Sequence, residues 1–356
     1  MSHRMFASRR AGAAGAGLAL AVVLAGCAEQ PLPAPAPQEV AGAAPAVTAE
    51  RAAQVHAAVA ADAAEADAAR DVALLEPRVT GAAAELREAR YRLQELLEEA
   101  PGPTPLDGEV LLDVVPAVGV PGAEQGQAPA RAVPPAEAAA TFPRTWMGVT
   151  QVPGAAPQLV VLVQDDARSP YRAVATTSLL PGAELPQTLA PEVGAPLLAP
   201  DAQGLALAPE EALSQYAAAL EDPDAAEAAR FGDDAFREAV LAERAAAEAV
   251  DFFAVETSRG VRPGSVTAVP TADGGALVVG VMDSEVVQQV EEAGAVLTLS
   301  EAVAALAGTE DAEERVASRY LEVVALAVPP APEEGAEPGP VQVVGADRVL
   351  VEAEAS

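Results

Sequence analysis

The chain has 356 residues, of which 53 are acidic and 21 are basic, and its formal net charge is −32. It contains no lysine, asparagine or isoleucine and one cysteine, which excludes an intrachain disulfide, multi-cysteine metal sites, a P-loop and Schiff-base catalysis. Because phosphate backbones are bound through clusters of basic residues, so acidic a chain is expected to have no nucleic-acid partner. The three missing residue types use A/T-rich codons, which points to a bacterium with a G/C-rich genome.

Residues 1–26 have the pattern of a secretory signal peptide. Arg4, Arg9 and Arg10 form a basic start, and the uncharged stretch from Ala11 to Gly26 follows. This stretch is about 16 residues long, which is shorter than the roughly 20 residues that span a bilayer as a helix. The sequence therefore predicts an exported protein and no membrane-spanning anchor in this segment.

The apolar stretch ends in Leu24, Ala25 and Gly26, followed by Cys27, the only cysteine of the chain. These four residues resemble the lipobox of bacterial lipoproteins. The resemblance implies that the Cys27 thiol carries a diacylglycerol such as a palmitate-containing one, and that the peptide is cut just before it. We therefore expect a protein anchored by lipid to the extracytoplasmic face of the cell membrane.

Cleavage would remove three arginines and no acidic residue, leaving 18 arginines against 53 acidic residues and a net charge of −35. An anionic membrane surface repels such a protein, so the lipid has to supply the attachment. After Cys27, residues 28–47 alternate alanine with five prolines. We interpret residues 27–47 as the lipidated cysteine and a polyproline-type tether that reaches about 60 Å.

Residues 48–182 are predicted to form a first α+β domain. Their alanine-rich start and a leucine repeat at three- and four-residue spacing indicate helices, and valine-rich runs then indicate strands. A loop is expected over about 117–140. The expected helices are 48–70 and 82–99, and the expected strands are 109–115, 144–152, 158–164 and 170–179.

Residues 183–204 contain prolines at regular intervals, so they are predicted to be a linker or long crossover rather than a packed element. Residues 205–356 would form a second α+β domain. A helical region over 209–250 is broken near Pro223 and Gly232, and a short helix is expected at 300–307. The expected strands are 251–257, 265–270, 275–283, 315–328 and 340–353.

This order of elements favours an α+β class over alternating βαβ units. The expected architecture is two tandem domains, each with helices on one face of a curved antiparallel sheet, as in cystatin-like or nuclear-transport-factor-like rolls. The strand sequences Val149–Pro153 and Val266–Pro270 are similar, and each precedes a second valine-rich run. This similarity indicates an internal duplication, or a chance likeness between strands of a biased composition.

The remaining chemistry is sparse. His56 is the only histidine after cleavage, and it is expected to be a solvated helix residue. Catalytic sites that pair a serine or cysteine nucleophile with a histidine are therefore not expected. The densest acidic stretch, from Glu221 to Asp234, lacks the spacing of a calcium loop, and we interpret it as a solvated corner between helices. Asp165 and Asp166 are expected to form a turn, and Asp273 with its two following glycines a hairpin turn. We therefore predict no metal, no cofactor and no catalytic residue.

Trp146, the only tryptophan, is expected on a strand just after Arg144. Core packing is the simplest interpretation of its position. The alternative is a ligand platform at the mouth of a roll, formed by Trp146 with Arg144 nearby.

Several segments resemble lipoproteins of actinobacteria that are built on a domain of unknown function. The likeness covers most of the chain after residue 60, and its motifs are structural, so it implies a location and a fold but no activity. It is weakest over 101–140 and after Pro329. The segments that carry it are Asp71–Gly81, Phe142–Thr150, Leu159–Arg172, Thr271–Val278 and Ala304–Gly308.

These observations lead to three functional hypotheses. The first is a non-catalytic binding or interaction module of the cell envelope, whose partner is an envelope protein or a small ligand. The second is a carboxylate-dependent hydrolase of envelope polysaccharide, which would need two facing carboxylates about 5–10 Å apart. The third is a solute-binding lipoprotein of a transporter, which would need a two-lobed alternation of strands and helices.

Overall fold

The computed structural model describes residues 45–117, 142–333 and 335–356, all of which belong to one compact unit. The predicted signal peptide, the lipobox at Cys27 and the tether up to residue 44 lie outside the described residues, as does most of the predicted loop over 117–140. Within the described part, no helix is both long enough and apolar enough to cross a membrane.

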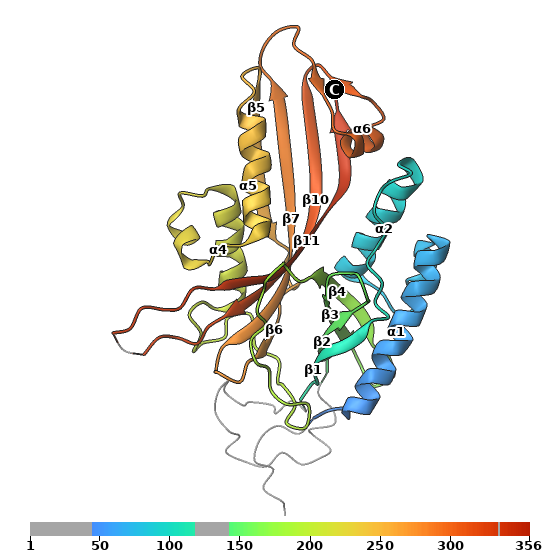
Figure 1. The fold of residues 1–356 in the computed structure, drawn as a ribbon, viewed down its shortest axis with the longest axis vertical. Helices are drawn as coiled ribbons and strands as arrows, with labels where there is room; N and C mark the ends of the chain where they lie inside the picture. Colours follow the sequence, from blue (N-terminus) through green and yellow to red (C-terminus); the bar gives the residue numbers. More distant parts are fainter. Residues whose placement is uncertain (1–44, 118–141, 334) are drawn as a thin grey trace, which may run out of the picture. The chain divides into compact units, whose positions relative to one another are not determined.

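Two helices begin the described chain: α1 (Ala49–Ala69) and α2 (Gly81–Leu96), with the short 3₁₀ helix η1 (Val72–Leu74) between them. The Thr48 side chain accepts a hydrogen bond from the Arg51 backbone N–H and so caps the first turn of α1. The helix ends at Arg70, whose φ of 51° is left-handed. Helix α1 turns mostly alanine and valine inward, and these side chains pack with those of the first sheet beside it (Figure 1).

The first sheet is an antiparallel meander in the order β1-β2-β3-β4. Its third strand is apolar on both faces, which explains why its sequence reads as a continuous valine–leucine run rather than an alternating one. Val160 and Leu162 pack toward α1, and Leu159 and Val161 pack toward the opposite side. The strands are β1 (Glu109–Val114), β2 (Arg144–Gln151), β3 (Gln158–Gln164) and β4 (Arg172–Ser178).

The second sheet is also antiparallel, in the order β11-β10-β7-β5, with β6 paired to β7. A separate two-stranded pair joins β8 (Leu297–Thr298) to β9 (Asp311–Ala312). The strands of the main sheet are β5 (Phe253–Val261), β6 (Thr267–Pro270), β7 (Ala276–Val290), β10 (Arg315–Val328) and β11 (Gln342–Ala355).

The second group of helices lies on one face of this sheet and at its end (Figure 1). Pro209 begins α4 at a position where the missing N–H costs nothing. Asp234 caps the next long helix by accepting the Arg237 backbone N–H at 2.7 Å. The elements are α4 (Pro209–Glu221), the 3₁₀ helix η2 (Ala226–Arg230), α5 (Ala235–Glu248) and α6 (Glu301–Ala307).

The inner faces of the two sheets meet in a shared core. Met147 and Val161 of the first sheet belong to the same buried cluster as Val281, Leu321 and Val323 of the second. The sheets are also joined by backbone contacts, because the Leu180 N–H donates to the Val344 carbonyl at 3.0 Å, and Leu179 forms an antiparallel bridge with Gly345. The layers therefore run from α1 through the first and second sheets to α4 and α5, and the second sheet extends past the first (Figure 1).

The sequence-based expectation of an α+β fold with antiparallel sheets is confirmed, and each predicted helix and strand is present within a few residues. The largest difference is in β7, which was expected to end at residue 283 but runs to Val290. The sequence did not predict this extension, because polar residues follow the valine-rich run from Asp283 onward. They remain in the strand because β5 and β10 pair with it on both sides.

The proline-rich segment 181–204 contains no helix or strand, as predicted. It is nevertheless fixed against its neighbours, unlike a free linker. The Ala195 N–H donates to Val115 and the Leu198 N–H donates to Ala268, both at 2.9 Å. Prolines prevent a regular ladder here, but the residues between them still form single backbone bonds.

The two similar strand sequences both form hairpins, but their pairing differs. Val149 pairs with Leu159 in the first hairpin. In the second, Thr267 pairs with Val279, and Val266, which corresponds to Val149 in the sequence comparison, lies before β6. The two similar sequences therefore both contribute to the first strand of a hairpin, but the two hairpins differ in strand register.

Candidate functional site

A line of polar side chains crosses the outer face of the second sheet. Residues that alternate along a strand point to the same face, and the strand register places Arg259 of β5 opposite Ser284 of β7, and Glu322 of β10 opposite Arg348 of β11. Each of the four strands thus contributes one polar residue. Toward α4, the same face continues with Met282 and other apolar side chains.

Glu322 is the centre of this line and is 0% exposed. Its carboxylate accepts a hydrogen bond from the Ser284 hydroxyl at 2.9 Å and one from Arg259 Nε at 3.3 Å. Arg348 forms an ion pair with the same carboxylate, and its Nε lies 3.3 Å from the oxygen that accepts the Ser284 hydroxyl. A buried carboxylate is costly unless it is paired and hydrogen-bonded, and here two guanidinium groups and one hydroxyl meet that need.

Helix α5 covers this line mainly through charged contacts. Arg348 Nη1 donates to Glu243 of α5 at 2.6 Å, and its guanidinium lies 3.7 Å from the centre of the Tyr320 ring. Arg244, the next residue of α5, donates to the Glu221 carbonyl and, at 2.6 Å, to Glu248. Val240 is the only residue of α5 that is fully buried.

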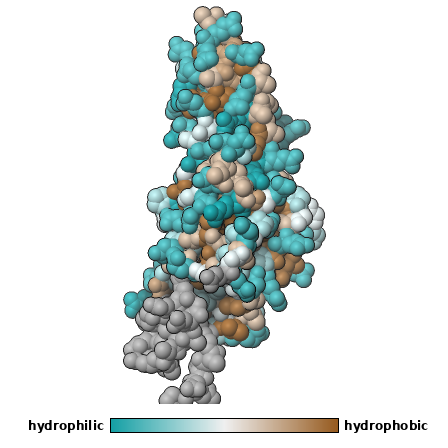
Figure 2. Space-filling view, turned by 90° about the vertical axis from the view of Figure 1, so that its left-hand side faces the viewer, coloured by the Kyte–Doolittle hydropathy of each residue, from teal (hydrophilic) through white to brown (hydrophobic). Residues whose placement is uncertain are grey.

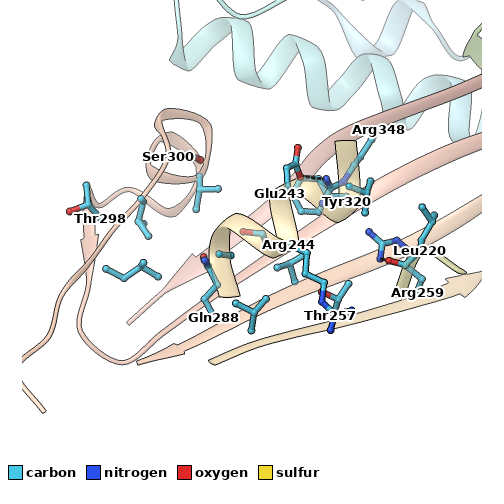
Figure 3. A pocket seen from close by; sticks show the side chains of 18 residues that line it. Leu220, Glu243, Arg244, Thr257, Arg259, Gln288, Thr298, Ser300, Tyr320 and Arg348 are labelled. Atoms are coloured by element: carbon cyan, nitrogen blue, oxygen red, sulfur yellow. Dashed lines mark hydrogen bonds and ion pairs between the residues drawn. The ribbon is translucent and has the colours of Figure 1, made fainter. Parts of the chain in front are cut away.

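A pocket of about 240 Å³ lies between α5 and the sheet. Figure 3 shows Arg259, Arg348 and Tyr320 toward one end of the pocket and Thr298 with Ser300 at the other end. Between these ends the walls are mostly aliphatic. The principal apolar side chains are Leu220, Val240, Val255, Val286, Leu297 and Val303.

The side of the molecule on which α4 and α5 lie faces the viewer in Figure 2, where hydrophilic residues are interspersed with small hydrophobic areas. Glu243 is 67% exposed at its side chain and Arg244 is 34% exposed, so the charged residues of α5 connect the pocket to solvent. Within the pocket, burial raises the pKa of the Tyr320 hydroxyl, which therefore stays neutral at physiological pH.

Trp146 and Arg144, the residues of the predicted ligand platform, lie on β2 and do not line this pocket. The Trp146 side chain is 2% exposed, packs beneath α1 and donates its indole N–H to Asp113 at 2.6 Å. The Arg144 guanidinium lies 4.5 Å from the centre of the Phe142 ring. The platform itself stays a prediction.

The expectation of a solvated His56 is wrong. Its side chain is 4% exposed, and its ring centre lies 5.5 Å from that of Trp146. Position 56 falls on the inward stripe of α1 together with Val55 and Val59, because these residues lie on one face at helical spacing. Burial lowers the pKa of the imidazole, and burial also raises the pKa of Asp113.

The acidic stretches act as caps and turns. Asp234 accepts the Tyr216 hydroxyl at 2.9 Å in addition to capping α5, and Asp222 accepts the Asp224 backbone N–H at 2.9 Å. The predicted turns at Asp166 and Asp273 are confirmed by hydrogen bonds from the residues that follow them. Among the described residues, no group of three or more histidine, cysteine or acidic side chains is placed to hold a metal ion.

Sequence reasoning missed the polar line, although one signal for it was present. Glu322 lies in phase with Val324, Leu326 and Val328, so strict alternation places it on a buried face. A lone acidic residue at an inward position requires a buried basic partner. Which arginines supply it depends on the pairing of β5 and β11 with their neighbours, and that pairing was not predicted.

Comparison with known families gives one match. The family model for a domain of unknown function, DUF8094, covers residues 43–355 of this chain. No curated protein and no solved structure matches it significantly. Because the match covers nearly all of the described chain, the protein belongs to the DUF8094 family.

Proposed function

We propose that this member of the DUF8094 family is a lipid-anchored protein on the extracytoplasmic face of the cell membrane, and that it binds a small ligand without catalysis of its own. The lipobox-like residues Leu24 to Cys27 at the end of the apolar stretch support the anchor. The tether of residues 28–47 and the charge of −35 after cleavage support a protein held near the membrane by its lipid alone.

In this proposal, residues 48–182 and 205–356 are two tandem helix-on-sheet domains joined by the segment 183–204. Two antiparallel sheets, each with helices on its outer face, support this arrangement. The proposed architecture is the cystatin-like or nuclear-transport-factor-like roll. The pocket beneath α5 lies between the second sheet and a helix that covers it.

The pocket of about 240 Å³ is the observation that carries the binding function. It is smaller than the roughly 300–1,000 Å³ of pockets for drug-sized ligands, and it combines aliphatic walls with a few polar groups. Both properties suit one small molecule.

Binding is favoured over polysaccharide hydrolysis by the placement of the carboxylates. Glu243, which lines the pocket, and Glu322, which does not, both contact Arg348 and are the pair that hydrolysis would have to use here. Glu322, however, is fully buried and held by Ser284 and Arg259, so it has no path to a glycosidic oxygen. The transporter alternative has less support, because both main sheets are antiparallel meanders without strand–helix alternation.

The anchor is tested by metabolic labelling of cells with a fatty-acid probe. The wild-type chain and a control variant in the tether, Ala46→Ser, should be labelled and found with the membrane. The Cys27→Ala variant should lose both properties. Labelled, membrane-bound Cys27→Ala protein would contradict the anchor.

Binding is tested by native mass spectrometry of the full-length protein purified from cells that export it. Val286 and Val287 are half-buried neighbours on β7, but only Val286 lines the pocket. A bound small-molecule mass should be present in wild type and in Val287→Phe, and absent in Val286→Phe. Absence of a bound mass in all three proteins, or equal occupancy in all three, would overturn the binding function.

A further inference from the structure

The charges around the pocket are inverted relative to the rest of the chain. Acidic residues outnumber basic residues 53 to 21 in the sequence, whereas the pocket lining contains Arg244, Arg259 and Arg348 against a single acidic residue, Glu243. In a protein this acidic, three arginines at one cavity indicate that the cavity is suited to negative charge.

Part of this positive charge is already neutralised. Glu322, beneath the pocket floor, pairs with both Arg259 and Arg348, and Glu243 pairs with Arg348. Arg259 and Arg348 are thus paired inside the network, whereas the carboxylate partner of Arg244 is Glu248, at 2.6 Å. The Glu221 carboxylate also lies at this end, where it accepts the Arg259 backbone N–H. Glu248 contacts Arg244 from the outside of α5, but its side chain is 46% exposed, so solvent and salt screen that pair.

Arg244 is the arginine that a ligand can recruit. Its Nη1 donates to a backbone carbonyl, that of Glu221, rather than to a second carboxylate. It lines the pocket and is 34% exposed, so it lies at the boundary between the cavity and solvent. Arg259, at 1% exposure, is instead committed to the buried network.

The walls and size of the pocket define the rest of the ligand. Valine and leucine side chains surround its middle, and its one aromatic ring, Tyr320, is covered by the Arg348 guanidinium. The lining therefore offers little aromatic surface for stacking against a sugar or a base. At about 30 Å³ for each water-sized group, the volume holds about eight such groups.

We propose that this pocket binds a short aliphatic monocarboxylate of about six carbons, whose carboxylate pairs with Arg244 at the arginine-rich end while its chain lies against Val255 and Val286. This assignment rests on the proposed binding function and adds the chemical class of the ligand. A charge-assisted hydrogen bond to Arg244 supplies selectivity, and the aliphatic walls supply burial of the chain.

The test is isothermal titration of the lipidated full-length protein in nanodiscs, with the signal of empty nanodiscs subtracted. Three probes share six carbons and differ in the head group, which is negative in hexanoate, neutral in 1-hexanol and positive in hexylamine. Hexanoate should bind at least about 10-fold more tightly than 1-hexanol, and hexylamine should bind least, because the lining carries excess positive charge.

Two variants locate the head group. Arg244→Gln should weaken hexanoate binding about 5- to 10-fold and leave 1-hexanol unchanged, because it removes the cation and keeps a polar side chain. Glu248→Gln, the matched control, removes the carboxylate that competes for Arg244 and should preserve or strengthen hexanoate binding. Thermal unfolding of each variant checks that the fold is intact.

Equal affinity for the three probes, no binding of hexanoate, or full hexanoate affinity in Arg244→Gln would each overturn the assignment of a monocarboxylate. These outcomes are separate from failure of the binding function itself. If Val286→Phe still loses the native bound mass while hexanoate fails to bind, the pocket binds a ligand of another class. If no protein carries a bound mass that Val286→Phe removes, the binding function fails.

Discussion

Helix α1 buries seven residues against the first sheet, whereas α5 buries Val240 alone against the second. Four of the seven inward residues of α1 are alanines, and none of the seven is an acidic residue or an arginine. The inward stripe of α5 instead places Glu243 and Arg244 between Val240 and Ala247. Apolar side chains fill the space beneath α1, whereas the pocket beneath α5 is lined in part by charged side chains of the helix itself.

The largest expected effect tests the filled side. Trp146→Ala should lower the free energy of unfolding by about 3–5 kcal/mol, because the ring is almost fully buried beneath α1 and nothing can replace its volume. Trp146→Phe keeps most of the ring but leaves Asp113 without its indole donor, so roughly 1–2 kcal/mol should be lost. Chemical denaturation measures both. An alanine variant as stable as wild type would mean that this layer is not closely packed.

The second effect concerns the polar line on the hollow side. Glu322→Ala should cost about 3 kcal/mol, because Arg259 would remain buried without its carboxylate. The double variant Glu322→Leu with Arg259→Met removes both members of the pair. Its loss in free energy of unfolding should be clearly smaller than the summed losses of Glu322→Leu and Arg259→Met. Urea unfolding of the single and double variants gives the coupling. Strict additivity would contradict a coupled network.

The third effect is a dependence on pH in the α1 layer. Burial lowers the pKa of His56 below 6.5, so below pH 6.5 the unfolded chain takes up a proton that the folded chain excludes. The contribution of this residue to stability is complete above pH 6.5 and decreases as the pH falls toward its folded pKa, by at most about 1.4 kcal/mol per pH unit.

His56→Gln should remove this dependence between pH 6.5 and the folded pKa, as measured by denaturation midpoints at a series of pH values. The comparison with the variant is needed because Asp113, whose pKa is raised by burial, has the opposite effect and favours the folded state as the pH falls. An unchanged pH slope in the His56 variant would show that another group is responsible.

The smallest effect sharpens the view of α5. Glu243→Gln removes a half-exposed ion pair with Arg348, so global stability should change by about 0.5 kcal/mol or less. Because α5 has few buried contacts, its amide hydrogens should nevertheless exchange faster in the variant, while those of α1 should not. Hydrogen exchange with mass spectrometry compares the two helices directly. Equal protection of α5 in wild type and variant would mean that apolar contacts alone hold it.

The local pattern of the sequence predicted most elements because their signals are local. The run Leu159–Val163 and the leucine spacing around Leu86–Leu96 indicate a strand and a helix without knowledge of their neighbours. His56 was misplaced because an alanine-rich helix gives a weak contrast between its buried and exposed faces. The pocket was missed because Arg259, Glu322 and Arg348 are far apart in sequence and meet only through strand pairing.

The last strand, β11, has a consequence for how the chain is made. Its 14 residues follow every other strand of the described chain, yet they pair with β10, contribute Arg348 to the polar line and connect to the end of β4. An emerging chain therefore cannot complete either the shared core or the pocket until β11 has been synthesised. Such dependence on distant contacts slows folding. It also means that a shortened chain lacking β11 would leave β10 as an unpaired edge, a site for association with other chains.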